Sequence, residues 1–250
     1  GPVLPEIEVV EGGWGAANPA DIRAVCRSAA EVLLRHVPGR RLDPISLTHS
    51  PDKGPMVIYG RGGKGERRVL LSPKDTYWAR FAYQFAHELA HILCGYRDGD
   101  PSNQWFEESV CEAASLFALR RMAEAWKTRP PYANWKGYAD ELARYADERI
   151  ASVPPRRESL ARWYRGHELL LREKADDRPK NQVVAVALLE LLEKDPSGWR
   201  AFGALNDRKT AAVRSFGAYL RDWHDAAAEA DRPFVRAVAA LFEIEVAGSR

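Results

Sequence analysis

The stretch QFAHELAHILCGY, residues 84–96, holds two histidines and a glutamate at spacings that suit metal-assisted hydrolysis. On a helix, His87 and His91 are four residues apart, so both imidazoles project from one face about one turn apart. This geometry suits two ligands of one tetrahedral Zn²⁺ ion. Glu88 points in a neighbouring direction, where it can act as the general base toward a zinc-bound water without ligating the ion. The alternative is that two histidines lie on one helix by chance, because the pattern is short.

A third ligand is expected downstream, because catalytic zinc usually takes three protein ligands and leaves one position for water. The segment WFEESVCE, residues 105–112, supplies three glutamates. Glu108 and Glu112 are one turn apart on the same helix face. Glu107 points elsewhere, and we expect it to be a solvated first-turn acid that favours the helix N-terminus. The segment therefore offers two carboxylates for the site.

HELAH followed by WFEE resembles the gluzincin metallopeptidases, the group that includes thermolysin and related aminopeptidases. A W-x-x-E pattern is common in that group, and Trp105 with Glu108 fits it. The resemblance implies Zn²⁺ as the cofactor, with His87, His91 and Glu108 as ligands and Glu88 as the base. It also implies that Glu112 orients a zinc-bound histidine, as carboxylates beside metal sites often do.

The three cysteines, Cys26, Cys94 and Cys111, are too few for a disulfide scaffold. Cys94 and Cys111 each follow a candidate ligand by three residues. A thiolate could bind zinc, but three ligands are already assigned. We interpret both as small buried side chains near the site, with a disulfide between them as the alternative.

The elements that position these residues are also indicated by the sequence. The segment 72–95 is predicted as a helix, with Ser72 as its cap, Gly95 at its end and a buried stripe at spacings of three and four. A second helix is expected over 105–126. The remaining N-terminal elements are a helix over 18–39 capped by Asn18, a strand over 44–50 and a β-hairpin over 56–71.

From about residue 133 onward the pattern is helical. We therefore predict an α+β fold. A zincin-like catalytic lobe, residues 1–127, would combine a small antiparallel sheet with the active-site helices. An all-helical lobe, residues 128–250, would close the cleft. Its helices are expected over 136–151, 157–175, 181–194, 210–228 and 232–245.

A peptidase also needs a group that stabilises the developing negative charge on the substrate. RWYRGHELL, residues 162–170, offers Tyr164 and His167, which are three residues apart and share a helix face. The alternative is an amphipathic helix whose tyrosine belongs to the core. DRPKNQ, residues 177–182, is interpreted as a polar loop and helix cap.

Composition excludes several classes of protein. Hydrophobic residues make up 46% of the 250 residues and the net charge is +2, which is typical of a folded globular chain without the basic footprint of nucleic-acid binding. No apolar run reaches the length that a membrane helix needs. The sequence leaves the oligomeric state open and is compatible with both a secreted or periplasmic and a cytoplasmic location.

The predicted function is therefore hydrolysis of a peptide or protein substrate by a zinc metallopeptidase. The resemblance also implies that the hairpin 56–71 offers a sheet edge to an extended substrate. Two alternatives belong to other classes: a zincin-fold binding or regulatory protein without turnover, and a zinc hydrolase of a non-peptide amide. Peptide cleavage by zinc-loaded protein would separate them.

Overall fold

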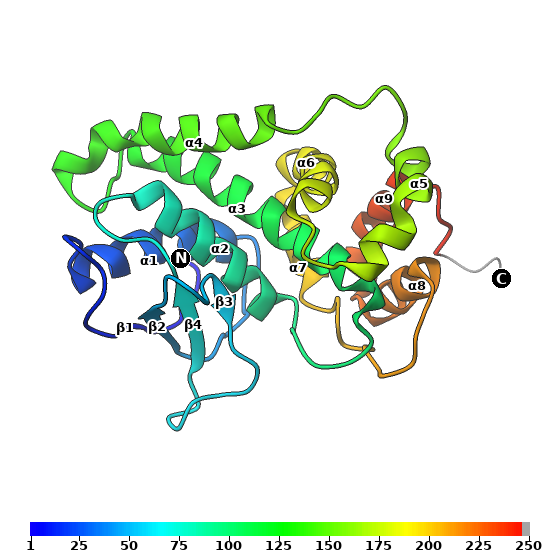
Figure 1. The fold of residues 1–250 in the computed structure, drawn as a ribbon, viewed down its shortest axis with the longest axis horizontal. Coiled ribbons are helices and arrows are strands. Elements are labelled where there is room, and N and C mark those ends of the chain that lie inside the picture. Colours follow the sequence, from blue (N-terminus) through cyan, green and yellow to red (C-terminus); the bar gives the residue numbers. More distant parts are fainter. Residues whose placement is uncertain (247–250) are drawn as a thin grey trace. The chain divides into compact units, whose positions relative to one another are not determined.

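The computed structural model describes residues 1–246, and the chain is α+β as predicted (Figure 1). It divides into two compact units. The first comprises Gly1–Ile92 and Ala114–Arg149, and the second comprises Leu93–Ala113 and Ile150–Arg250. The division into a catalytic lobe, residues 1–127, and a helical lobe that closes the cleft, residues 128–250, stays a prediction.

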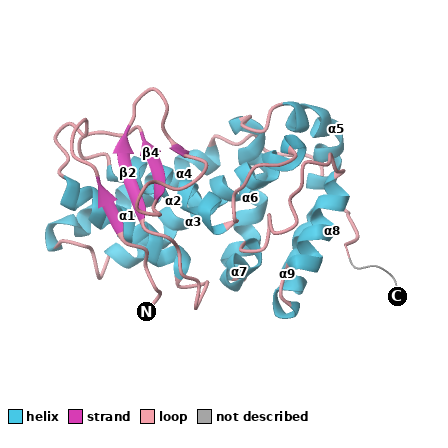
Figure 2. Cartoon of the chain, turned by 90° about the horizontal axis from the view of Figure 1, so that it is seen from below, coloured by secondary structure: helices cyan, strands magenta, loops and turns pink. Residues whose placement is uncertain are grey.

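The first unit contains the sheet, which appears as magenta arrows in an otherwise helical chain (Figure 2). The long helix α3 (Gln104–Trp126) contributes its second half to this unit. The other elements are β1 (Ile7–Val9), α1 (Pro19–Leu34), β2 (Ile45–His49), β3 (Met56–Val57), β4 (Arg67–Leu71), α2 (Trp78–Leu93), the short 3-10 helix η2 (Ala133–Tyr138) and α4 (Ala139–Ala151).

The sheet has the strand order β1-β2-β4-β3 and is mixed, so the prediction of an antiparallel sheet was wrong. β1 and β2 pair in parallel because α1 lies between them in the chain and returns it to the same end of the sheet. β2 and β4 are also parallel. Only β3 and β4 pair antiparallel, with Val57 opposite Val69, which confirms the hairpin at 56–71.

Local sequence signals predicted the start of α1 correctly, whereas long-range contacts make α2 shorter than predicted. The Asn18 side chain accepts a hydrogen bond from the Asp21 N–H at 2.9 Å and caps α1 as predicted. The predicted cap Ser72 is instead held by Gln84, whose Oε1 accepts from the Ser72 N–H at 3.0 Å. Asp75 has φ of 59° and its Oδ1 accepts from the Ala16 N–H at 2.9 Å. These contacts hold the segment before Trp78 as a loop, so α2 begins six positions later than expected.

The predicted apolar stripe of α2 is buried in the core, and Gly95 follows the helix with a φ of 68°. Its members are Phe81, Phe85, Leu89 and Ile92. In the first unit, α2 and α3 are joined where the Ser115 hydroxyl donates to the Tyr83 carbonyl at 2.8 Å. Both residues lie mid-helix, so this bond fixes which sides of the two helices face each other.

The second unit is all helical over its described residues. Three of its helices are shorter than the sequence predicted, and the one predicted over 181–194 is longer. α6 begins at Arg178, three positions earlier than predicted, because Asp177 caps it. α8 begins at Phe216, because Ser215 is its cap. The elements are η1 (Pro101–Asn103), α5 (Leu160–Glu173), α6 (Arg178–Lys194), η3 (Pro196–Gly198), α7 (Trp199–Phe202), α8 (Phe216–Ala226), η4 (Glu229–Asp231) and α9 (Arg232–Leu241).

Aromatic rings form the centre of the second unit. Trp105 and Phe106, on the first turn of α3, both contact Phe216 of α8, with ring centroids 4.7 and 5.3 Å apart. Phe242 joins them after α9, 5.0 Å from Phe216. These contacts bury the start of α3 among helices that follow it by more than 100 residues in the chain.

No helix within residues 1–246 is long and apolar enough to cross a membrane, as the sequence predicted.

Candidate metal centre

His87 and His91 lie on one buried face of α2. Their ring centroids are 5.1 Å apart and the rings are inclined at 67°. His87 is 9% exposed and His91 is 5% exposed. Glu88, between them, is 3% exposed. A buried pair of imidazoles beside a buried carboxylate is unusual unless the groups share hydrogen bonds or bind an ion.

The first half of α3 carries the other candidate residues. Glu108, Cys111 and Glu112 follow the helical spacing that leads to Ser115, the residue bonded to Tyr83 of α2. Cys111 and Glu112 are buried, whereas Glu108 is partly exposed. The three residues therefore share one side of α3 with Ser115.

Among residues 1–246, one group of potential ligands is close enough to share an ion. The ligand atoms of His87, His91 and Cys111 all lie within 4.8 Å of one another. Glu108, the ligand implied by the resemblance, is outside this group. Two imidazoles and a thiol are donors that Zn²⁺ accepts readily, so the chemistry of this set fits the ion. All three cysteines are free thiols, and no disulfide joins Cys94 to Cys111.

Glu112 contacts a residue that the sequence interpretation assigned to a polar loop. Its Oε1 lies 3.4 Å from Nε of Arg178, at the start of α6. The Glu112 side chain is 3% exposed and that of Arg178 is 55% exposed. A buried carboxylate is thus held by a guanidinium that reaches it from the surface, and Arg178 fixes the position of Glu112.

We expect Arg178→Ala to lower the free energy of unfolding by about 1–2 kcal/mol, because a buried carboxylate loses its positive partner. The matched control is Arg165→Ala, since Arg165 pairs with Glu243 at 2.9 Å and both side chains are more than half exposed. Removing that exposed pair should cost less than about 0.5 kcal/mol. Urea unfolding followed by circular dichroism measures both, and equal losses would contradict a structural role for the Arg178 contact.

Glu107 is not the solvated acid that was predicted. It is 1% exposed, and its Oε2 accepts from Nδ2 of Asn206 at 2.8 Å. The same amide nitrogen donates to the Cys94 carbonyl at 3.1 Å, just beyond the end of α2. Tyr219 donates its hydroxyl to Oδ1 of Asn206 at 3.4 Å. Burial, with the nearby Glu107 charge, raises the pKa of Tyr219 well above its usual value, so this hydroxyl stays a donor.

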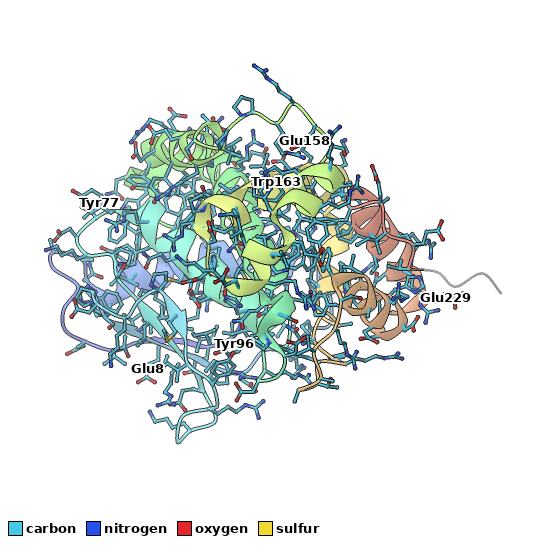
Figure 3. The ribbon with its side chains drawn as sticks, turned by 45° about the vertical axis from the view of Figure 1, so that its right-hand side comes forward. Glu8, Tyr77, Tyr96, Glu158, Trp163 and Glu229 are labelled. Carbon is cyan, nitrogen blue, oxygen red and sulfur yellow. The ribbon has the colours of Figure 1, made fainter. Side chains whose placement is uncertain are left out.

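Tyr164 and His167 lie on α5 in different surroundings. Tyr164 is buried and stacks on Trp105, with ring centroids 5.5 Å apart. Burial and a hydrogen bond to Glu168 raise its pKa. His167 stacks on Trp163, which is labelled in Figure 3, at 4.4 Å, and its Nδ1 lies 2.8 Å from the Trp163 carbonyl. Tyr164 is therefore a core residue, as the alternative expected, and a role for either residue in stabilising charge stays a prediction.

Sequence reasoning missed Arg178 and Asn206, and it assigned Cys111 to packing. Arg178 and Asn206 lie in polar segments that carry no motif, and each meets its partner across more than 60 residues of chain. Only the rule that a buried charge needs a partner could have predicted that such residues exist. Comparisons of the chain with protein-family models, curated proteins and solved structures found no match.

Proposed function

We propose that this chain is a zinc-dependent hydrolase that cleaves peptide bonds, and that its first half is a zincin-like catalytic lobe of the gluzincin type. The observation that carries the proposal is the buried face of α2, where the His87 and His91 rings lie 5.1 Å apart. Their ligand atoms, with that of Cys111, are close enough to hold one ion. A bound Zn²⁺ would supply Lewis acidity, which polarises a carbonyl group and lowers the pKa of water.

In this proposal Glu88 is the general base. It follows His87 directly in α2, so its carboxylate leaves the helix in a different direction from the two imidazoles and lies beside the proposed metal ligands. Its burial at 3% exposure removes competing solvent. The carboxylate accepts a proton from the attacking water and delivers it to the leaving amine.

Glu112 and Arg178 have a positioning role in the same proposal. Because Arg178 holds Glu112 at 3.4 Å, the Glu112 carboxylate has a fixed orientation from which it can hydrogen-bond a ligand. β3 is the last strand in the sheet order, which supports an extended peptide as the substrate. Tyr164 and His167 are the predicted candidates for stabilising the developing negative charge.

The proposal predicts that purified protein binds one equivalent of zinc and cleaves peptides only when loaded. We expect chelation with 1,10-phenanthroline to abolish cleavage of a mixed peptide library, and added Zn²⁺ to restore it. Mass spectrometry measures both metal content and products. Protein without stoichiometric zinc would contradict the proposal at its first step. Zinc-loaded protein that cleaves no peptide would favour a non-catalytic role or a non-peptide amide substrate.

A further inference from the structure

The geometry points to Cys111, rather than Glu108, as the third protein ligand of the metal. This inference rests on the metal-binding part of the proposed function and goes beyond it. It identifies a His₂Cys donor set, in which one thiolate replaces the carboxylate that the gluzincin resemblance implies.

The register of α3 places Cys111 opposite the histidines. The Ser115 hydroxyl donates to the Tyr83 carbonyl at 2.8 Å, which anchors one turn of α3 on one turn of α2. Stepping four residues from Tyr83 along α2 gives His87, and stepping four residues from Ser115 in the opposite sense along α3 gives Cys111. Each step is one helical turn, which agrees with the grouping of the Cys111 thiol with the first imidazole.

The distances agree with this register. The ligand atoms of His87, His91 and Cys111 all lie within 4.8 Å of one another. Zinc–nitrogen bonds of about 2.0 Å and zinc–sulfur bonds of about 2.3 Å place tetrahedral ligand atoms about 3.5 Å apart. Small side-chain movements would therefore bring the three atoms onto one ion. Glu108 is outside this group and is partly exposed.

The chemistry of the donors agrees as well. Cys111 is fully buried, so little solvent competes with the metal for its sulfur, and two imidazoles with one thiolate form a known set of three protein ligands for catalytic zinc. A thiolate supplies one negative charge, as a glutamate would, so the charge on the metal site stays the same. Thiolate and imidazole donors together favour zinc over magnesium or calcium, which prefer oxygen.

Cobalt substitution tests the assignment without any need for turnover. Co²⁺-loaded wild-type protein should show an intense sulfur-to-cobalt charge-transfer band in the near ultraviolet. Cys111→Ser should lose this band and bind zinc at least about 100-fold more weakly, the upper end of the losses known for outer partners of metal ligands. Glu108→Gln should keep the band and bind zinc within a few-fold of wild type.

Cys94→Ser is the matched control. Cys94 is also buried and lies near the end of α2, but it is not in the ligand group among the described residues. We expect it to keep the band. If Cys111→Ser does not fold, X-ray absorption of the zinc-loaded wild-type protein gives the same answer, with one sulfur at about 2.3 Å.

The outcomes separate this inference from the proposed function. A metal-loaded wild-type protein without a sulfur signal, or loss of zinc binding in Glu108→Gln alone, would overturn Cys111 as a ligand and leave the hydrolase proposal standing. A sulfur signal in protein that cleaves no peptide would support Cys111 and contradict the peptidase proposal.

Discussion

Glu88→Gln should lower kcat for peptide cleavage by about 100- to 10,000-fold, the range over which a positioned general base accelerates reactions. Glutamine has nearly the shape of glutamate, but its amide does not accept the proton of the attacking water. A base from the buffer should not replace the missing carboxylate, because Glu88 is 3% exposed and solvent reaches it poorly. Steady-state kinetics on the best peptide from a library screen measures the effect.

Zinc content and thermal stability serve as the internal controls for this variant. Both should match the wild-type values, because Glu88 is not in the group of potential ligands among residues 1–246. His87→Gln provides the contrast, because it should lose zinc and activity together. A Glu88→Gln enzyme that keeps zinc and works within fivefold of wild type would show that another group acts as the base.

Much of the fold follows from local sequence signals. Asn18 caps α1 through the Asp21 N–H, and the alternating segment around Ile45 forms β2. The stripe that includes Phe81 and Phe85 faces the core of the first unit. Each of these predictions depends on residues a few positions apart, where backbone geometry alone decides which side chains meet. For the same reason the His87 and His91 pair could be predicted directly.

The parts that could not be predicted depend on contacts between distant residues. Ser72 has the type and spacing of a cap, yet Gln84 and the link from Asp75 to Ala16 hold its segment as a loop. The proposed third ligand, Cys111, shows the same limit. Helical spacing gives Glu108, Cys111 and Ser115 one common side, but the Ser115 bond to Tyr83 sets how far α3 slides along α2. In our proposal that offset decides which residue joins the histidines as a ligand, and no pattern within α3 encodes it.

Among polar side chains, Asn206→Ala should cause a large loss of stability. The Asn206 amide bridges the Glu107 carboxylate at 2.8 Å and the Cys94 carbonyl at 3.1 Å. Removing it leaves a carboxylate that is 1% exposed without one of its donors. Breaking a buried hydrogen bond to a charged group leaves its desolvation uncompensated, so we expect a loss of about 2–4 kcal/mol in the free energy of unfolding. In a chain of this size, each kcal/mol lost from the free energy of unfolding lowers Tm by about 2–4 °C.

Asn181→Ala is the matched control for this variant, because Asn181 is buried to nearly the same extent. Its Nδ2 donates only to the Ala175 carbonyl, and its Oδ1 has no hydrogen-bond partner within the described chain. The control should therefore lower the free energy of unfolding by about 1 kcal/mol, the net contribution of one neutral hydrogen bond.

A double variant tests the role of the Glu107 charge. In a Glu107→Gln background, Asn206→Ala should lower the free energy of unfolding by less, because a neutral amide tolerates the lost donor better than a carboxylate does. Equal costs for the two asparagines, or no coupling to Glu107, would show that Asn206 only fills space. The expected coupling would instead mean that a buried charge holds the segment around Asn206, which precedes α8, against the start of α3.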